Sequence, residues 1–158
     1  MRTLTIPAVL LASCTLASAD EGVPERRFGV TRLFGVTVGQ PQGLSASAGL
    51  IIGTVPAKPV KCAFGYWSDG IFVQIEPGIG GGKASLGLAT SNSMFGMAAK
   101  GSVVRTWGKT WGTQPDATYV GGELEFAAFV KLNAGWLWRT GSSTAKRGMF
   151  TWGVGLGF

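Results

Sequence analysis

The sequence predicts an all-β protein, an eight-stranded antiparallel up-and-down transmembrane β-barrel. Glycine occupies 26 of the 158 positions and charged residues make up only 14%. This composition is too apolar for a disordered chain and too poor in charge for an ordinary soluble surface. Apolar residues recur at every second position in many segments, which is the period of a β-strand. After the N-terminal region, no segment reaches the length of about 18 apolar residues that a membrane-spanning helix needs.

The first 19 residues have the organisation of a secretory signal peptide. A basic start precedes an apolar run over residues 4–16, and Ala17 and Ala19 form an A-x-A cleavage site. We therefore expect cleavage after Ala19. The alternative is a lipobox ending at Cys14, which would then be acylated and become the mature N-terminus.

Period-two alternation marks nine candidate strands after the signal peptide. The clearest is the last one, in which Phe150, Trp152 and Val154 share one face while glycines share the other. The candidates span residues 28–39, 44–54, 60–68, 71–79, 83–91, 94–108, 118–130, 132–140 and 148–158.

Bacterial single-chain barrels have an even number of strands, so one candidate is surplus. The first is the weakest, because Arg32 stands within its apolar face, where a lipid-facing arginine costs roughly 2–4 kcal/mol. The third candidate stays, since the Asp69-Gly70 pair that follows it is a strong hairpin-turn signal. We expect residues 20–40 to lie outside the barrel or at its rim, and residues 41–158 to form it.

The connections of this arrangement fall into two classes. Short turns are expected at residues 69–70, 92–93 and near 131, and longer loops at 109–117 and 141–147. Short turns at one end and longer loops at the other are the outer-membrane pattern.

One face of each predicted strand is apolar, and the other is small or charged. In a soluble barrel the second face would meet water and would be rich in lysine, glutamate, threonine and asparagine. Here it consists largely of glycine, alanine and serine, which suit a narrow lumen. The apolar face is therefore predicted to meet lipid, and closure of the sheet satisfies the backbone within the bilayer.

Charged residues with inward parity are expected to pair in the lumen, because an unpaired buried charge is costly. A general acid–base role for Glu123 and Glu125 is the alternative. The chain contains no histidine, which removes the commonest general base and zinc ligand. We expect no catalysis, no metal and no cofactor. The predicted lumen charge network comprises Lys61, Glu76, Lys83, Glu123, Glu125, Lys131 and Arg139.

Trp107, Trp111 and Tyr119 are predicted to form an aromatic girdle at the membrane surface, where such residues concentrate. A site for lipopolysaccharide or a protein partner at these residues is the alternative. The net charge of +6 suits an anionic lipid surface, and no interleaving of arginine with aromatic residues indicates a nucleic-acid partner.

The signal peptide, the glycine-rich alternating strands and the C-terminal run together resemble the small outer-membrane β-barrel proteins of Gram-negative bacteria. In that family the barrel-assembly machinery reads a final aromatic residue and the alternating apolar residues before it. Here these residues are Trp152, Val154, Leu156 and Phe158. The resemblance implies an outer-membrane location, contact with outer-membrane lipid and lipopolysaccharide, and a monomer.

The expected function is a structural or surface-interaction role in the cell envelope. Enzymes of the family resemble one another in using a catalytic histidine, which this chain lacks. Two alternatives remain open at this point. One is a narrow outer-membrane channel, and the other is a soluble periplasmic or secreted β-barrel that carries an apolar ligand.

Overall fold

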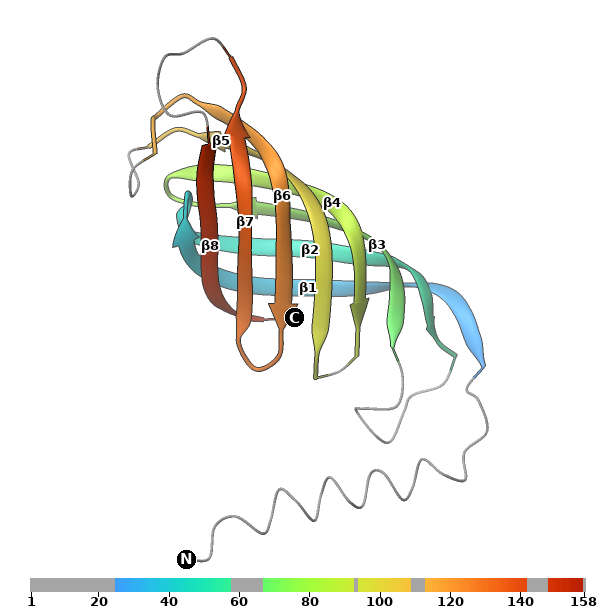
Figure 1. The fold of residues 1–158 in the computed structure, drawn as a ribbon. Coiled ribbons are helices and arrows are strands. Elements are labelled where there is room, and N and C mark those ends of the chain that lie inside the picture. Colours follow the sequence, from blue (N-terminus) through green and yellow to red (C-terminus); the bar gives the residue numbers. More distant parts are fainter. Residues whose placement is uncertain (1–24, 58–66, 93, 109–112, 142–147, 158) are drawn as a thin grey trace, which may run out of the picture.

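Eight β-strands make up the described part of the chain, which is drawn in Figure 1. The computed structural model describes residues 25–57, 67–92, 94–108, 113–141 and 148–157. None of these segments is a helix long and apolar enough to cross a membrane. The strands are β1 (Arg26–Gln40), β2 (Gly43–Pro56), β3 (Ser68–Pro77), β4 (Gly81–Ser91), β5 (Gly96–Thr106), β6 (Thr118–Ala127), β7 (Lys131–Arg139) and β8 (Gly148–Gly157).

The strands pair in chain order, and the sheet closes on itself as an antiparallel ring. The closing pairs between β1 and β8 run from Gly35 with Gly157 to Gln40 with Trp152. Register partners followed once around the ring from Gln40 lead back to β1 at Val30, ten residues earlier. With a rise of about 3.3 Å per residue and a strand spacing of about 4.8 Å, this offset implies a strand tilt of about 40° and a radius of about 8 Å. Side chains can fill an interior of that width.

The prediction of eight antiparallel strands is confirmed, but the set of strands differs from the predicted one. The expectation that residues 20–40 lie outside the barrel or at its rim is wrong for Gly35 to Gln40, which pair with both β2 and β8. Residues 26–34 pair with β2 at the end of the ring, and residues 20–24 lie outside the described residues. Of the candidate strand 60–68, residues 60–66 lie outside the described residues, and Ser68 already belongs to β3. The other seven candidates coincide with strands to within a few residues at each end.

The predicted turn at Asp69-Gly70 is also wrong. Both residues lie inside β3, opposite Thr54 and Gly53 of β2. A Cβ atom added to Gly70 would lie 2.2 Å from the carbonyl oxygen of Ile52. Glycine at this position therefore permits a close approach of two strands rather than a turn.

The ring has two ends: the N/C end, where β1 begins and β8 finishes, and the far end, which lies opposite. At the far end β1 joins β2 through residues 41–42 and β3 joins β4 through residues 78–80; β5 is also followed by β6 there, and β7 by β8. At the N/C end β2 is followed by β3, β4 by β5 and β6 by β7. The predicted short turns at 92–93 and near 131 do fall at the opposite end from the predicted longer connections 109–117 and 141–147, but the sorting is not complete, because two short connections, 41–42 and 78–80, also lie at the far end.

Inner and outer faces alternate along every strand. In β5 the even-numbered residues from Gly96 to Thr106 are buried and the odd-numbered ones between them are exposed. The exposed positions of the ring carry most of the large apolar side chains, whereas the buried ones include many serine, threonine, lysine and glutamate residues. The ring is therefore apolar outside and largely polar inside.

Candidate functional site

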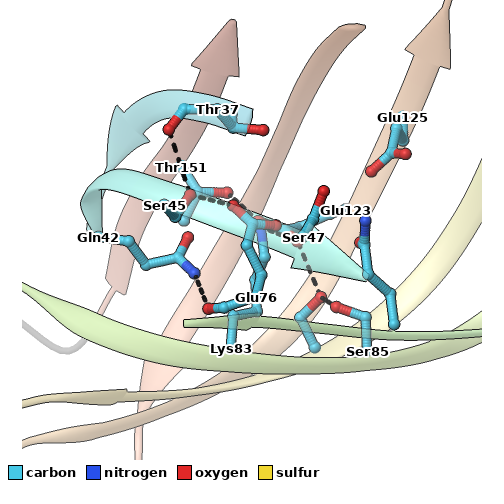
Figure 2. A network of polar contacts seen from close by, with 12 residues as sticks. Thr37, Gln42, Ser45, Ser47, Glu76, Lys83, Ser85, Glu123, Glu125 and Thr151 are labelled. Atoms are coloured by element: carbon cyan, nitrogen blue, oxygen red, sulfur yellow. Dashed lines mark hydrogen bonds and ion pairs between the residues drawn. The ribbon is translucent and has the colours of Figure 1, made fainter. Parts of the chain in front are cut away.

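Charged side chains meet inside the ring in two groups, the first centred on Lys83 (Figure 2). The Lys83 Nζ atom lies 3.2 Å from Glu76 Oε2 and 3.2 Å from Glu123 Oε2. All three side chains are at most 2% exposed. Glu76 Oε2 has no hydrogen-bond partner among the described residues, so its contact with Lys83 is an ion pair only. One ammonium group thus neutralises two buried carboxylates in part.

Hydroxyl groups from neighbouring strands hold these two carboxylates in place. Ser45 donates a hydrogen bond of 2.7 Å to Glu76 Oε1. Ser102 and Thr151 donate hydrogen bonds of 2.8 and 2.9 Å to the two carboxylate oxygens of Glu123. These donors come from β2, β5 and β8, so the group joins strands on different sides of the ring (Figure 2).

The second group is centred on Glu125. Its carboxylate contacts the ammonium groups of Lys100 and Lys131, the latter at 3.2 Å. Lys100 also donates a 2.8 Å hydrogen bond to Gln74 Oε1, and its Nζ atom lies 5.4 Å from the centre of the Phe72 ring. The cation–π contact adds a further favourable interaction for a desolvated lysine.

The two groups carry opposite net charge. The Lys83 group has two acids and one base, and the Glu125 group has one acid and two bases. Lys100 and Glu123 are register partners on β5 and β6, so the groups adjoin along the ring axis. Together the six charges balance, which lowers the cost of burying them.

Apolar layers lie above and below the charged groups. Near the N/C end Ile51, Phe72 and Ala98 pack together with Leu33 and Ala89. Near the far end Val104, Ala117, Tyr119 and Leu137 pack together with Met149. A cavity of about 30 Å³ next to Glu125 and Lys131 has room for about two water molecules. The interior is therefore packed rather than open.

The structure brings together five of the seven residues predicted for the lumen network: Glu76, Lys83, Glu123, Glu125 and Lys131. Lys61 lies outside the described residues. Arg139 does not join the group, because it stands at the end of β7, opposite Tyr119 of the far apolar layer. Its guanidinium donates a hydrogen bond to Gln114 Oε1 instead.

Lys100 is the member of the network that sequence reasoning missed. Hydropathy does not separate the two faces of β5, since each carries a valine, a cation and small residues. The signal that could have found it is the register with β6, which places Lys100 opposite Glu123.

The outer face of the ring carries an apolar belt bounded by charged rims. Arg26, Arg32 and Asp69 lie on this face near the N/C end, and Arg105 lies near the far end. Taking about 3.3 Å per residue and the tilt of about 40°, Arg32 and Arg105 are about 20 Å apart along the ring axis. The belt includes Phe34, Val36, Val38, Leu44, Ile71, Val73, Ile75, Leu86, Leu88, Val103, Val120, Leu124, Phe126, Leu132, Trp136, Phe150, Trp152, Val154 and Leu156.

The three residues predicted for an aromatic girdle do not share one location among the described residues. Trp107 is exposed at the far end, where its indole N–H donates to the carbonyl oxygen of Ile79 at 2.9 Å. Trp111 lies outside the described residues. The placement of Tyr119 on the outside is wrong, because its side chain is 4% exposed and belongs to the far apolar layer. Its inward parity, shared with Glu123, outweighs the preference of its residue type.

Three of the four predicted assembly-signal residues lie on β8, the last described strand of the ring. Trp152, Val154 and Leu156 project from the outer face of β8. Phe158 lies outside the described residues, as do Ala17, Ala19 and Cys14.

The carboxylates of the site are held by ion pairs and hydrogen bonds. Glu123 and Glu125 share a face, yet each carboxylate is engaged by lysine, and Glu123 also by hydroxyl groups. Within the described ranges, no three residues of histidine, cysteine, aspartate or glutamate are placed to hold a metal ion. Neither a family model, nor a curated protein, nor a solved structure matches the chain.

Proposed function

We propose that this chain is a small integral outer-membrane β-barrel protein of a Gram-negative bacterium, with a structural or surface-interaction role in the cell envelope. The observation that carries the proposal is the apolar belt around a charged interior. Its height of about 20 Å is close to the apolar band of about 25 Å found on outer-membrane barrels. The strands of 9 to 15 residues are long enough to cross at a tilt near 45°.

The place where the β1–β8 pairing stops supports the same proposal. Strand β1 pairs with β8 from Gly35 to Gln40, within the belt. Of the β1 residues with no described partner on that side, Arg26 to Arg32 lie at or beyond the Arg32 rim, and only Leu33 and Phe34 lie inside it. Unpaired backbone groups are not tolerated in the hydrocarbon region but are satisfied in water.

A structural role fits the interior better than the alternatives do. A channel needs a continuous aqueous path, whereas here two apolar layers flank six paired charges. A carrier of an apolar ligand needs an apolar cavity, whereas the cavity bordered by Glu125 and Lys131 has room for only about two water molecules. The partners in this proposal are outer-membrane lipid, lipopolysaccharide and the barrel-assembly machinery. The protein acts as a monomer and catalyses no reaction.

Quenching of tryptophan by brominated lipid tests the proposal. Trp136 and Trp152 lie on the belt, so bromine atoms placed midway along the acyl chains should quench the reconstituted protein's fluorescence. In cells the protein should stay in the membrane fraction through a sodium carbonate wash. Release by carbonate together with unquenched fluorescence would show a soluble or peripheral protein.

A further inference from the structure

Strand β1 is longer than the strand that closes the ring against it. Its pairing with β2 covers Arg26 to Gly39, but its pairing with β8 starts only at Gly35. Among the described residues, no strand lies against the other edge of β1 from Arg26 to Leu33. This segment is called the free edge below, and Figure 1 shows it as the blue extension of the sheet at the N/C end.

Hydrogen bonding to β2 fixes which backbone groups the free edge presents. The N–H group of Ala57 donates to the carbonyl oxygen of Glu25 at 2.9 Å. Since successive residues of a strand direct their N–H and C=O groups to opposite sides, the odd-numbered residues of β1 bond to β2. The even-numbered residues Arg26, Phe28, Val30 and Arg32 therefore direct their backbone groups away from β2, toward the side on which no described strand lies.

The same residues present an apolar and basic outer surface. Phe28 and Val30 are 79% and 54% exposed although they lie beyond the Arg32 rim. Proteins commonly cover or blunt a long sheet edge, because it is a template for another strand. This edge carries no proline and no bulge between Arg26 and Leu33. It has the form of a docking site for an extended chain.

The charge of the free edge indicates which kind of polypeptide would pair with it. Glu25 precedes the free edge, and within it Arg26, Arg27 and Arg32 are basic with no acidic residue among them. Arg26 is paired with Asp69 at 3.2 Å, and no described residue forms an ion pair with Arg27 or Arg32. A second copy of the chain, paired antiparallel along the whole edge, would place Arg32 opposite Arg26 of the partner, and like charges in that position are destabilising.

We propose that the free edge of β1 binds an extended acidic segment of another polypeptide by strand addition. The added strand runs antiparallel to β1, in line with β8, and exchanges backbone hydrogen bonds with Phe28, Val30 and Arg32. It carries apolar residues opposite Phe28 and Val30 and a carboxylate opposite Arg32. The site does not depend on insertion into a membrane, so the quenching test and the test below can fail independently.

Residue-resolved amide exchange of the folded, detergent-solubilised protein tests this inference. The probe is a synthetic peptide that alternates threonine with valine in its centre and with glutamate at its ends. We expect the amides of Phe28, Val30 and Arg32 to exchange rapidly in the free protein and at least about tenfold more slowly with the peptide, as for newly bonded groups. The amides of Gly29 and Thr31, already bonded to β2, should not change.

Variants separate backbone pairing from charge. Val30→Pro removes a donor from the free edge without removing a bond to β2, so it should weaken peptide binding about tenfold or more while the ring stays folded. Val30→Thr keeps the N–H group and should bind nearly as well as the native chain. Arg32→Glu should weaken binding of the acidic peptide and strengthen binding of a lysine-for-glutamate version.

Three results would overturn the inference. One is slowed exchange at odd and even residues alike, which would indicate general stabilisation. Another is equal binding of the acidic and lysine peptides by the native protein. The third is slow exchange of Phe28, Val30 and Arg32 in the free protein together with a dimer in sedimentation, which would show that a second copy occupies the edge. Because the exchange pattern is read on the native chain, a misfolded variant does not remove the test.

Discussion

Replacing Lys83 with methionine should be the most damaging single change inside the ring. Lys83 is the only described cation that forms an ion pair with Glu76 and Glu123, each at 3.2 Å. Lys83→Met keeps most of the side-chain volume and removes the charge, which deprives two carboxylates that are 1% exposed of their ion-pair partner. The hydroxyl groups of Ser45, Ser102 and Thr151 cannot compensate for that loss of charge.

The expected cost follows from the number of pairs that are broken. Removing one partner of a buried ion pair costs about 3–5 kcal/mol, and Lys83 serves two pairs. We expect Lys83→Met to lower the free energy of unfolding by at least about 4 kcal/mol. Lys131→Met is the matched control, because Glu125 would retain Lys100. That control should cost only about 1–3 kcal/mol.

Equilibrium unfolding by urea or guanidinium in detergent or lipid, followed by tryptophan fluorescence, measures both costs. Adding Glu123→Gln to Lys83→Met removes one orphaned charge while its amide oxygen still accepts a hydrogen bond. This double variant should recover about 1–3 kcal/mol, a coupling typical of residues in direct contact. Equal costs for Lys83→Met and Lys131→Met, or no recovery in the double variant, would refute the description of the interior as two unequal charge groups.

Three further predictions concern the belt, the lumen and the chain end. Leu124→Arg, in the middle of the belt, should lower stability in lipid by about 2–4 kcal/mol, whereas Thr54→Arg, opposite Asp69 at the N/C rim, should cost about 0–1 kcal/mol; equal costs would argue against a membrane around the belt. The protein should be electrically silent in planar bilayers, since paired charges and two apolar layers fill its interior; steady single-channel currents would contradict this. Deleting Phe158 should leave folding into detergent or lipid intact in vitro but cause loss of the protein in cells, detected by blotting outer-membrane fractions; normal outer-membrane levels would argue against an assembly signal.

Much of the fold follows from local periodicity. Seven strands were predicted from alternation alone, and the structure shows them within a few residues. The errors arose where one local signal was given too much weight. Asp69-Gly70 has the chemistry of a hairpin turn, yet pairing with Thr54 and Gly53 keeps both residues in β3.

The charged interior was partly predictable for the same reason. Glu76, Lys83, Glu123, Glu125 and Lys131 share the inward parity of their strands and meet in the ring. Parity alone could not predict how these charges divide into two groups, because that division depends on side-chain contacts between several strands. It also could not exclude Arg139, which has the right parity but lies at the end of its strand.

The sequence pattern does not show how far along the ring axis a residue lies. Parity assigns a residue to the inside or the outside, but depth depends on the offset of ten residues accumulated around the whole ring. An arginine on the apolar face of a strand is costly only where that face meets lipid. The offset places Arg32 at the rim of the belt, where this cost is small. The same offset places Arg26 to Val30, which have no described partner on the β8 side, beyond the rim of the belt. Inside the belt, β1 needs a neighbouring strand on each side, because its backbone groups cannot bond to water there. Beyond the belt, water can satisfy those groups, so the edge of β1 is open to an added strand.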